Sequence, residues 1–425
     1  MILTSDLELP LPATDLLPIT KTLSPADQGD LAAAIADAHL SGTAIYPFGG
    51  ATSLHYGLAA KQPGVGLSLG KVNRVVDYPA RDLTVTVEAG MTMQSLSDLL
   101  AQEGQRLPID VPQAELATVG GVVATNWNGP RRLGCGTVRD YVIGISAIDG
   151  RGMPFKGGGR VVKNVAGYDF CKLLTGSLGT LGVISQVTFK LRPLTEQFSL
   201  MACAVSSTAE AEKLLAALVN SQVTPVAVEL LAGPAWDSEP ALSTLAKGTA
   251  SQRLYLVVGL EGTAAEVEWM ASTLHQQWRE LGVAAPITIG DGADLWKKLV
   301  EFPVAGESPL VLKASLVPSG VTAFVEAVRT LDPLCSVQSH AGNGTVIARL
   351  ATFPKEGLSR ALVGNLQPVA ASHHGHVSVL ANPSGAEMTH QSVWGGIDAP
   401  FLLMTSVKKK FDPKNILNPG RFVYV

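Results

Sequence analysis

The sequence has 425 residues, which is too long for one hydrophobic core and predicts at least two domains. Its formal net charge is -4, and no run of Lys or Arg exceeds the three residues 408–410, so the basic surface of a nucleic-acid-binding protein is not expected. Charged residues make up 16% of the chain, against roughly 25% in ordinary soluble proteins, which favours large buried cores and an apolar face for a partner.

The sequence also disfavours a membrane-spanning or secreted protein and a metal or disulfide site built from its cysteines. No stretch approaches the roughly 20 uninterrupted apolar residues that a membrane helix needs, and the first residues, MILTSDLELPLP, lack the pattern of a secretory signal. The four cysteines are scattered without a C-x-x-C pair, so neither a zinc or iron–sulfur site nor a disulfide framework is expected. We therefore expect a cytoplasmic chain with no metal cluster of its own.

After an irregular lead-in over residues 1–23, the first half alternates helices and strands. Ser24 as N-cap and Pro25 in the first turn predict a helix that ends at Gly42. Further along the chain, glycine and the spacing of apolar residues predict a hairpin turn over 155–159, a helix over 93–102, and strands over 43–47, 65–69, 83–88, 142–148 and 183–191.

Three glycine-rich segments divide these strands, at residues 46–57, 117–136 and 163–182. Successive backbone N–H groups in such turns form a nest for an anion, and glycine lets the backbone approach a ligand closely. One G-x-x-G-x-x-G pattern is weak, and tight packing alone would account for it. Three in one half of the chain favour a large cofactor that carries phosphate.

The second half has a different pattern from about residue 195. Helices are predicted over 209–218, 264–282 and 321–331, and strands over 254–259, 310–316 and 345–350. Two passages in which strands and helices alternate predict an α+β domain with one antiparallel sheet covered by helices. No internal repeat is evident by eye, and a domain of two cryptic halves stays open. Lys408–Lys410 is interpreted as a solvated helix end, and residues 411–421 as an extended tail that Asn418 and Arg421 fasten onto the first domain.

These motifs carry a family resemblance. PFGGATS, ATVGGVVATN and GSLGTLGVISQVTFKLRP resemble the FAD contacts of the vanillyl-alcohol-oxidase-like flavoproteins, which have the PCMH-type FAD-binding fold. KNVAGYDFCKLLTGSLGTLGVI looks most like the GlcE-type FAD-binding subunits of glycolate oxidases, and FDPKNILNPGRF is similar to their closing tail. The resemblance implies an α+β fold: a two-subdomain FAD-binding domain at 24–194, an α+β cap domain at 195–400, and a tail at 401–425 that returns to the FAD domain.

The resemblance also implies the residues that bind FAD. By position, Gly49, Gly50, Ala51, Thr52 and Ser53 would bind the diphosphate. The diphosphate and ring system would meet Thr118, Gly120, Gly121, Ala124 and Asn126, and the adenine side would meet Gly179, Gly182, Val183 and Ile184, with Pro47 and Pro108 also assigned to the cofactor. Relatives that tether FAD covalently often carry His where this chain has Ala51, so the resemblance implies non-covalent FAD.

Catalytic residues are assigned to two histidines. Related D-2-hydroxyacid dehydrogenases carry the motif H-x-G-D-G-N-x-H, which supplies metal ligands or a base, whereas this chain reads HAGNGTVI from His340 to Ile347. Isoleucine cannot bind a metal or take a proton, so independent hydroxyacid oxidation is in doubt. His373, His374 and His376 form a cluster whose spacing would also suit a metal, but with no carboxylate before Glu387 a polar loop is preferred. In the alternative, His376 faces the flavin as a base or as a donor to the substrate carboxylate.

The resulting prediction is an FAD-binding subunit of a glycolate oxidase or dehydrogenase complex. It would oxidise glycolate, or a related D-2-hydroxyacid such as D-lactate, and pass electrons through FAD to an iron–sulfur partner subunit beside a catalytic FAD subunit. Such a chain would be cytoplasmic or attached through its partners to the inner face of the membrane. Two alternatives stay open: a self-sufficient FAD oxidase or dehydrogenase of another hydroxyacid or alcohol, and a structural subunit without catalysis of its own.

Overall fold

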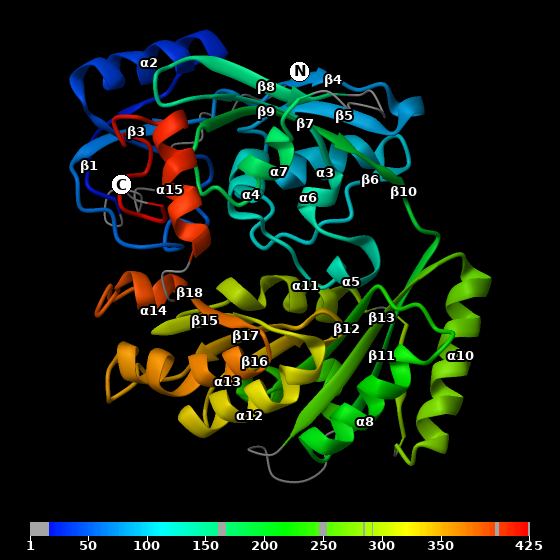
Figure 1. The fold of residues 1–425 in the computed structure, drawn as a ribbon. Coiled ribbons are helices and arrows are strands. Elements are labelled where there is room, and N and C mark those ends of the chain that lie inside the picture. The colour runs from blue at the N-terminus through cyan, green and yellow to red at the C-terminus, as the bar shows by residue number, and fades with distance from the viewer. Residues whose placement is uncertain are drawn as a thin grey trace.

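The computed structural model describes residues 17–159, 167–245, 253–283, 285–290, 292–395 and 399–423. Two layered assemblies are joined by the chain at β10 and β11 (Figure 1). The upper one in this view contains a three-stranded and a five-stranded sheet, and the lower one contains a single eight-stranded sheet. The boundary predicted at 194/195 stays a prediction.

The three-stranded sheet is parallel. Its order is β1 (Ile19–Leu23), β3 (Gly64–Ser68) and β2 (Ala44–Phe48), with α2 (Gln28–Ser41) between β1 and β2 in the chain. Leu31, Ile35 and Ala38 form the buried stripe of α2, as their helical spacing predicts, and Gly42 ends the helix with φ 68°. The helix begins later than predicted, because the Asp27 side chain accepts hydrogen bonds from the N–H groups of its first turn, so Asp27 and not Ser24 is the N-cap.

The five-stranded sheet is antiparallel. Its order is β4 (Val75–Asp77), β5 (Thr84–Glu88), β9 (Val183–Lys190), β7 (Val142–Ile148) and β8 (Pro154–Gly158). The predicted hairpin turn over 155–159 is wrong, since this segment forms β8 and pairs with β7; its glycines fit because Phe170 and the Ile143 carbonyl occupy the space beside them. The short elements between the strands are α3 (Met93–Ala101), β6 (Gln105–Arg106), α4 (Val119–Thr125), α5 (Arg132–Cys135), α6 (Val138–Tyr141), α7 (Phe170–Leu174) and β10 (Arg192–Pro193).

All pairings of the eight-stranded sheet are antiparallel, which confirms the predicted sheet type. Two halves of matching order, strand–helix–strand–strand–helix–strand, are joined where β12 pairs with β16. The repeat that is not evident by eye is therefore present in the fold. The strands in chain order are β11 (Gln197–Val205), β12 (Ala227–Ala232), β13 (Leu254–Gly262), β14 (Ile287–Ile289), β15 (Leu310–Ser315), β16 (Ser336–His340), β17 (Thr345–Leu350) and β18 (His376–Ala381).

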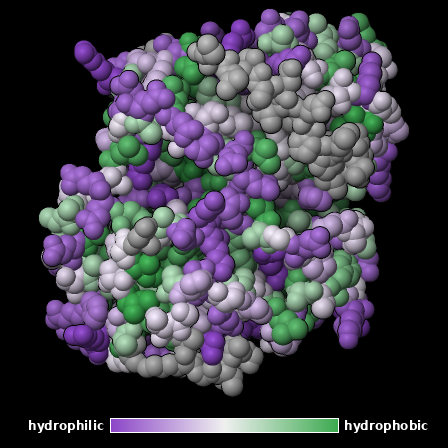
Figure 2. Space-filling view, turned by 180° about the vertical axis from the view of Figure 1, so that it is seen from behind, coloured by the Kyte–Doolittle hydropathy of each residue, from purple (hydrophilic) through white to green (hydrophobic). Residues whose placement is uncertain are grey.

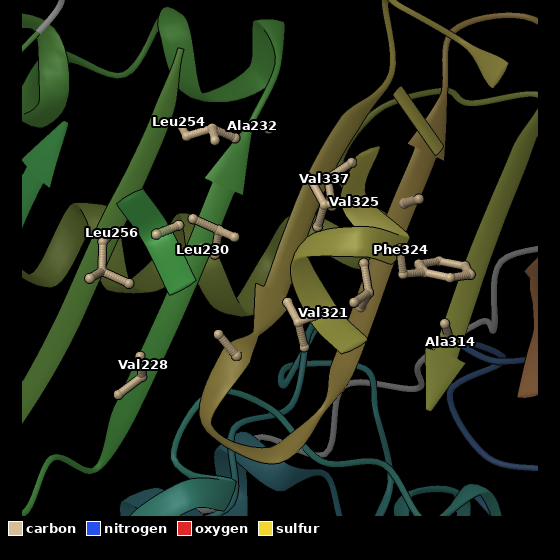
Figure 3. Close-up of a cluster of buried hydrophobic side chains, with 14 of the residues drawn as sticks. Val228, Leu230, Ala232, Leu254, Leu256, Ala314, Val321, Phe324, Val325 and Val337 are labelled. Carbon is tan, nitrogen blue, oxygen red and sulfur yellow. The ribbon is translucent and has the colours of Figure 1, made fainter. Parts of the chain in front are cut away.

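One face of this sheet is covered by helices. The helices are α8 (Thr208–Val219), α10 (Ala264–Glu280), α12 (Val321–Leu331) and α13 (Gln367–Ser372), and Figure 3 shows Val321, Phe324 and Val325 of α12 packed on the sheet. The opposite face carries α11 (Ala293–Glu301), and Tyr56 and Trp127 of the upper assembly pack against its hydrophobic cluster. Because side chains alternate along a strand, every second residue of β15–β18 points toward the upper assembly.

Ion pairs hold the two assemblies together. Glu261 on β13 is buried and accepts hydrogen bonds from Arg106 at 2.7 Å and from Arg131 at 2.6 Å. The Arg131 guanidinium also pairs with Asp110 and stacks 4.4 Å from the ring of Trp296. These contacts fix the eight-stranded sheet against the upper assembly, and with it the residues that face the glycine-rich turns.

The C-terminal segment returns to the upper assembly through α14 (His390–Trp394) and α15 (Ala399–Phe411). Beyond α15, the Ile416 carbonyl accepts a hydrogen bond from Ile45 N at 2.7 Å, beside β2. The interpretation of 408–410 as a solvated helix end is wrong for Lys408, whose side chain is fully buried and paired with Asp412. On the face seen in Figure 2, hydrophobic residues lie scattered among hydrophilic ones, and no helix in the described part of the chain is long and apolar enough to span a membrane.

Candidate active site

A cavity lies where the three glycine-rich turns meet. It encloses about 860 Å³, part of which is open to solvent. The predicted cofactor-binding residues line it, with two exceptions: Pro108 lies in a separate groove between the assemblies, and Asn126 ends α4 with φ 51°. The lining residues that are shared with the prediction are Pro47, Gly49, Gly50, Ala51, Thr52, Ser53, Thr118, Gly120, Gly121, Ala124, Gly179, Gly182, Val183 and Ile184.

The first turn, residues 49–53, follows β2 and exposes its backbone donors. None of its five N–H groups finds an acceptor within the part of the chain that the structure describes. Ala51 adopts a left-handed conformation with φ 60°, and the hydroxyls of Thr52 and Ser53 line the same cavity. Successive free N–H groups around a left-handed residue form a concave anion site without needing a cationic side chain.

Glycine is required in these turns because they pack against one another. A Cβ on Gly49 would lie 2.1 Å from Thr118 Oγ1, and one on Gly50 would lie 1.7 Å from the Leu116 carbonyl oxygen. On Gly120 the nearest atom would be Ala89 Cβ at 2.8 Å. The sequence interpretation placed a ligand in this space, whereas the structure fills it with protein, so the glycines shape the cavity indirectly.

The third turn, residues 176–182, is fixed to α4. Gly176 N donates to the Val123 carbonyl at 2.9 Å, and Leu178 N donates to the Ala124 carbonyl at 2.8 Å. The Leu178 carbonyl in turn accepts a hydrogen bond from Asn418 Nδ2 at 2.8 Å. The third turn is therefore held between α4 and the C-terminal tail.

Arg421, which the sequence interpretation gave only a fastening role, also lines the cavity. Its Nη2 donates hydrogen bonds to the carbonyls of Leu54 and Tyr56, the second at 2.8 Å, so the fastening role is present as well. Burial lowers the pKa of Arg421 to about 10, and the guanidinium stays charged at neutral pH. The tail motif around Arg421 was the available signal, but its sequence does not show that the side chain points into the cavity.

Tyr56 connects the cavity to the eight-stranded sheet. Burial raises the pKa of Tyr56 to about 12, and the nearby side chain of Ser378 opposes this effect. Ser378 lies on β18, opposite Lys313 on β15 in the register of the sheet. The strand neighbours of Lys313 and Ser378 point toward the helices. The side chains of Lys313 and Ser378 therefore lie on the opposite face of the sheet, which meets the upper assembly.

Three basic side chains lie near one another beside Tyr56 and Ser378, and we call them the cation cluster: Arg132, Lys313 and His376. Burial lowers the pKa of Lys313 to about 8, and the nearby charge of Arg132 contributes. His376 is exposed at the start of β18, yet the protein atoms around its ring still desolvate it, and this effect, followed by the charge of Lys313, lowers its pKa. Within the described ranges no ion pair joins Lys313 or Arg132 to a carboxylate. Asp140 is near enough to raise the pKa of Arg132, whereas no carboxylate of the described structure acts on Lys313, so the cation cluster carries a net positive charge.

His340 has a different environment. Its side chain is buried at the end of β16, where Nδ1 lies 2.8 Å from Glu229 Oε1, and Gln338 Nε2 donates to the other carboxylate oxygen at 2.8 Å. The side chain of Asn343 is buried without a hydrogen-bond partner in the described structure. His340 does not line the cavity, and no group of three metal-ligating residues gathers in the described ranges.

Comparison with known families agrees with this architecture. Residues 20–157 match a family model described as FAD binding domain. Residues 194–379 and 398–422 match a second model, described as FAD linked oxidases, C-terminal domain. Together the two models span both assemblies and the C-terminal tail.

Full-length relatives are similar at low identity. A D-lactate dehydrogenase of Archaeoglobus fulgidus is 27% identical over 94% of this chain and 90% of its own. The glycolate oxidase subunit GlcD of Bacillus subtilis is 24% identical over 89% of this chain and 83% of its own. The Escherichia coli glycolate oxidase subunit GlcE is 42% identical, but only over 28% of this chain and 34% of its own.

A solved structure supports the fold. The chain superposes on alkyldihydroxyacetonephosphate synthase with a TM-score of 0.70, over 94% of this chain and 77% of that one, at 17% identity. At this identity the likeness concerns the fold, and the predicted PCMH-type FAD-binding architecture with an α+β cap is confirmed.

Proposed function

Because the chain belongs to the superfamily of FAD-linked oxidases and uses FAD, we propose that it oxidises a small 2-hydroxyacid to the 2-oxoacid. One observation supports this most directly: a cavity with a free anion nest adjoins, through Tyr56 and Ser378, a cluster of side chains with net positive charge. The cavity suits the cofactor, and the cation cluster suits the carboxylate of a hydroxyacid.

The cavity fits FAD in the chemistry of its walls. The first turn offers free N–H donors to a diphosphate, and Thr118, at the start of α4, packs beside Gly49 of that turn and lines the same cavity. Apolar residues such as Leu69, Val183 and Ile184 offer surface to flat rings. We propose that FAD is bound without a covalent link, since the position of the usual tethering histidine holds Ala51.

The cation cluster is proposed to hold the substrate. Lys313 and Arg132 would bind the carboxylate, because neither cation forms an ion pair in the described structure, although Asp140 lies near Arg132, and two such cations favour an anionic ligand. His376 would accept the hydroxyl proton, since its lowered pKa leaves it neutral at pH 7 and able to act as a base. When bound, FAD accepts the two electrons of a hydride, which leaves the 2-oxoacid as product.

His340 is proposed to position the sheet and not to take a proton from substrate. The contact with Glu229 occupies Nδ1 and fixes the ring where β12 and β16 meet. Ile347 on the neighbouring strand removes the second metal-ligating position of the family motif. We therefore propose His376, and not His340, as the residue that accepts the substrate's hydroxyl proton.

We further propose that electrons leave through an iron–sulfur partner subunit, as in a glycolate oxidase complex. The four cysteines lie apart in the described structure and each is buried and free, so a cluster would have to be held by another chain. Similarity to GlcE over part of the chain supports this partner. The full-length similarity to D-lactate dehydrogenase and to GlcD favours the alternative of a self-sufficient catalytic chain.

The test is an anaerobic titration of the purified flavoprotein with glycolate and then with D-lactate, following the visible absorption of the flavin. Loss of the visible absorption band of oxidised flavin would support oxidation by this chain alone. A band that stays unchanged with both substrates, but bleaches with dithionite, would contradict catalysis by the isolated chain and support a relay or structural subunit. Iron analysis of material co-purified with the tagged chain then tests for the partner.

A further inference from the structure

Arg421 differs from every other residue of the cavity wall. Among the described residues that line the cavity, it alone carries a charge at neutral pH. Its side chain is buried, with the residue 7% exposed, and no carboxylate of the described chain pairs with it. A buried guanidinium without a counter-charge is costly, so its retention in a binding cavity indicates an anionic ligand.

The position of the guanidinium identifies the part of the ligand that it can meet. Nη2 is held by the carbonyls of Leu54 and Tyr56, which directly follow the first turn at 49–53. Within the described structure these are the hydrogen bonds of the Arg421 guanidinium, and both come from the one nitrogen. Donors on Nε and Nη1 therefore remain for a ligand beside the nest.

We infer that Arg421 is the counter-cation of the FAD diphosphate, shared between the C-terminal tail and the anion nest of the first turn. The nest supplies only the partial charges of backbone N–H groups, whereas the diphosphate carries two negative charges. Arg421 supplies a full charge at the same end of the cavity. The tail thus completes the cofactor site, and the inference holds whatever the substrate proves to be.

A purely structural role makes a different prediction. If Arg421 only fastens the tail, any side chain that donates hydrogen bonds to the two carbonyls should serve, with or without a charge. If it pairs with the diphosphate, the charge itself is needed. Arg421→Gln keeps donors and removes the charge, whereas Arg421→Lys keeps the charge.

The experiment measures the dissociation constant of FAD from each holoprotein by the fluorescence of released flavin. Arg421→Gln should bind FAD at least about tenfold more weakly than the wild type, because hydrogen bonds to charged groups are worth this much or more. Arg421→Lys should stay close to wild type, and so should Arg360→Gln, a control at an exposed arginine. Equal weakening in the Gln and Lys variants, or no weakening in either, would overturn the inference.

A second variant tests the charge within one polypeptide, should the Gln variant fail to fold. Arg421→His is charged at pH 5.5 and neutral at pH 8, about one unit or more to either side of the usual histidine pKa. FAD affinity of this variant should fall by about tenfold between the two pH values, while that of the wild type should not. A fall of the same size in the wild type, or no fall in the variant, would overturn the inference independently of substrate oxidation.

Discussion

Lys408 Nζ donates a hydrogen bond of 2.8 Å to the carbonyl oxygen of Thr180, which lies 228 residues earlier in the third glycine-rich turn. The same nitrogen contacts Asp412 Oδ2 at 2.5 Å and the Leu417 carbonyl at 2.9 Å. Both charged side chains are fully buried. One lysine therefore fixes the C-terminal tail and one wall of the cofactor cavity together.

Replacing this lysine should destabilise the protein strongly. Lys408→Met leaves the Asp412 carboxylate buried without its cation, which costs about 3–5 kcal/mol in comparable pairs. Urea unfolding should show the loss, and FAD content should fall because the Thr180 contact disappears. The adjacent Lys409 is exposed, so Lys409→Met should change the unfolding free energy by less than about 0.5 kcal/mol. Equal stability of the two variants would contradict a structural role for the buried pair.

The packing of the turns makes a second prediction. Gly50→Ala places a Cβ 1.7 Å from the Leu116 carbonyl oxygen, so the first turn must move away from the second. We expect a destabilisation of about 1–3 kcal/mol, typical of overpacking, and a purified protein with little bound flavin, measured by the ratio of visible to ultraviolet absorption. Gly70→Ala is the matched control, because the nearest atom to its Cβ, Ser68 Oγ, lies 3.6 Å away. Full flavin content in Gly50→Ala would refute this account.

Much of the architecture could be predicted because its signals are local. Apolar spacing identified α12 and β17 to the residue, and the glycine-rich turns identified the cavity wall. A turn's backbone donors are determined by a few neighbouring residues, so the free N–H groups at 49–53 could be expected from the sequence without tertiary structure, whereas their binding of an anion stays a prediction.

The remaining features depend on contacts between distant segments. Lys408 is indistinguishable from its lysine neighbours in sequence, and its burial follows from acceptors at Thr180 and Leu417. The symmetry of the eight-stranded sheet depends on the pairing of β12 with β16, about a hundred residues apart in the chain. Lys313 stood within a predicted strand, yet its position beside His376 follows only from the register of β15 with β18.

His376 provides a test of the proposed base. His376→Asn should lower kcat by about 10²–10⁴-fold, the usual contribution of a general base, with a smaller effect on KM. In the wild type kcat should fall only at pH values below the ordinary histidine pKa, because desolvation and the charge of Lys313 lower the pKa of His376 and a base must be deprotonated to act. Single-turnover flavin reduction measures both the loss of rate in His376→Asn and the pH dependence of the wild type.

The control for this substitution is His374→Asn, two residues before His376 and just outside β18. His374 is exposed and has φ 56°, a conformation that asparagine tolerates, so this variant should reduce flavin at the wild-type rate. Wild-type flavin reduction in His376→Asn, or equal losses in both variants, would exclude His376 as the base.

Lys313 should make substrate binding sensitive to alkaline pH. Burial, with a contribution from Arg132, lowers the pKa of Lys313 to about 8, so the ammonium that attracts the carboxylate is present below that pH and lost above it. The KM for the hydroxyacid should therefore be constant at neutral pH and rise above about pH 8.

In Lys313→Arg the rise should vanish, since arginine stays protonated across this range, whereas Lys313→Met should show a KM raised about tenfold or more at every pH. The exposed Lys355→Met serves as control and should keep the wild-type profile. A rise that persists in both Lys313 variants would assign the titration to another group and remove Lys313 from the carboxylate site.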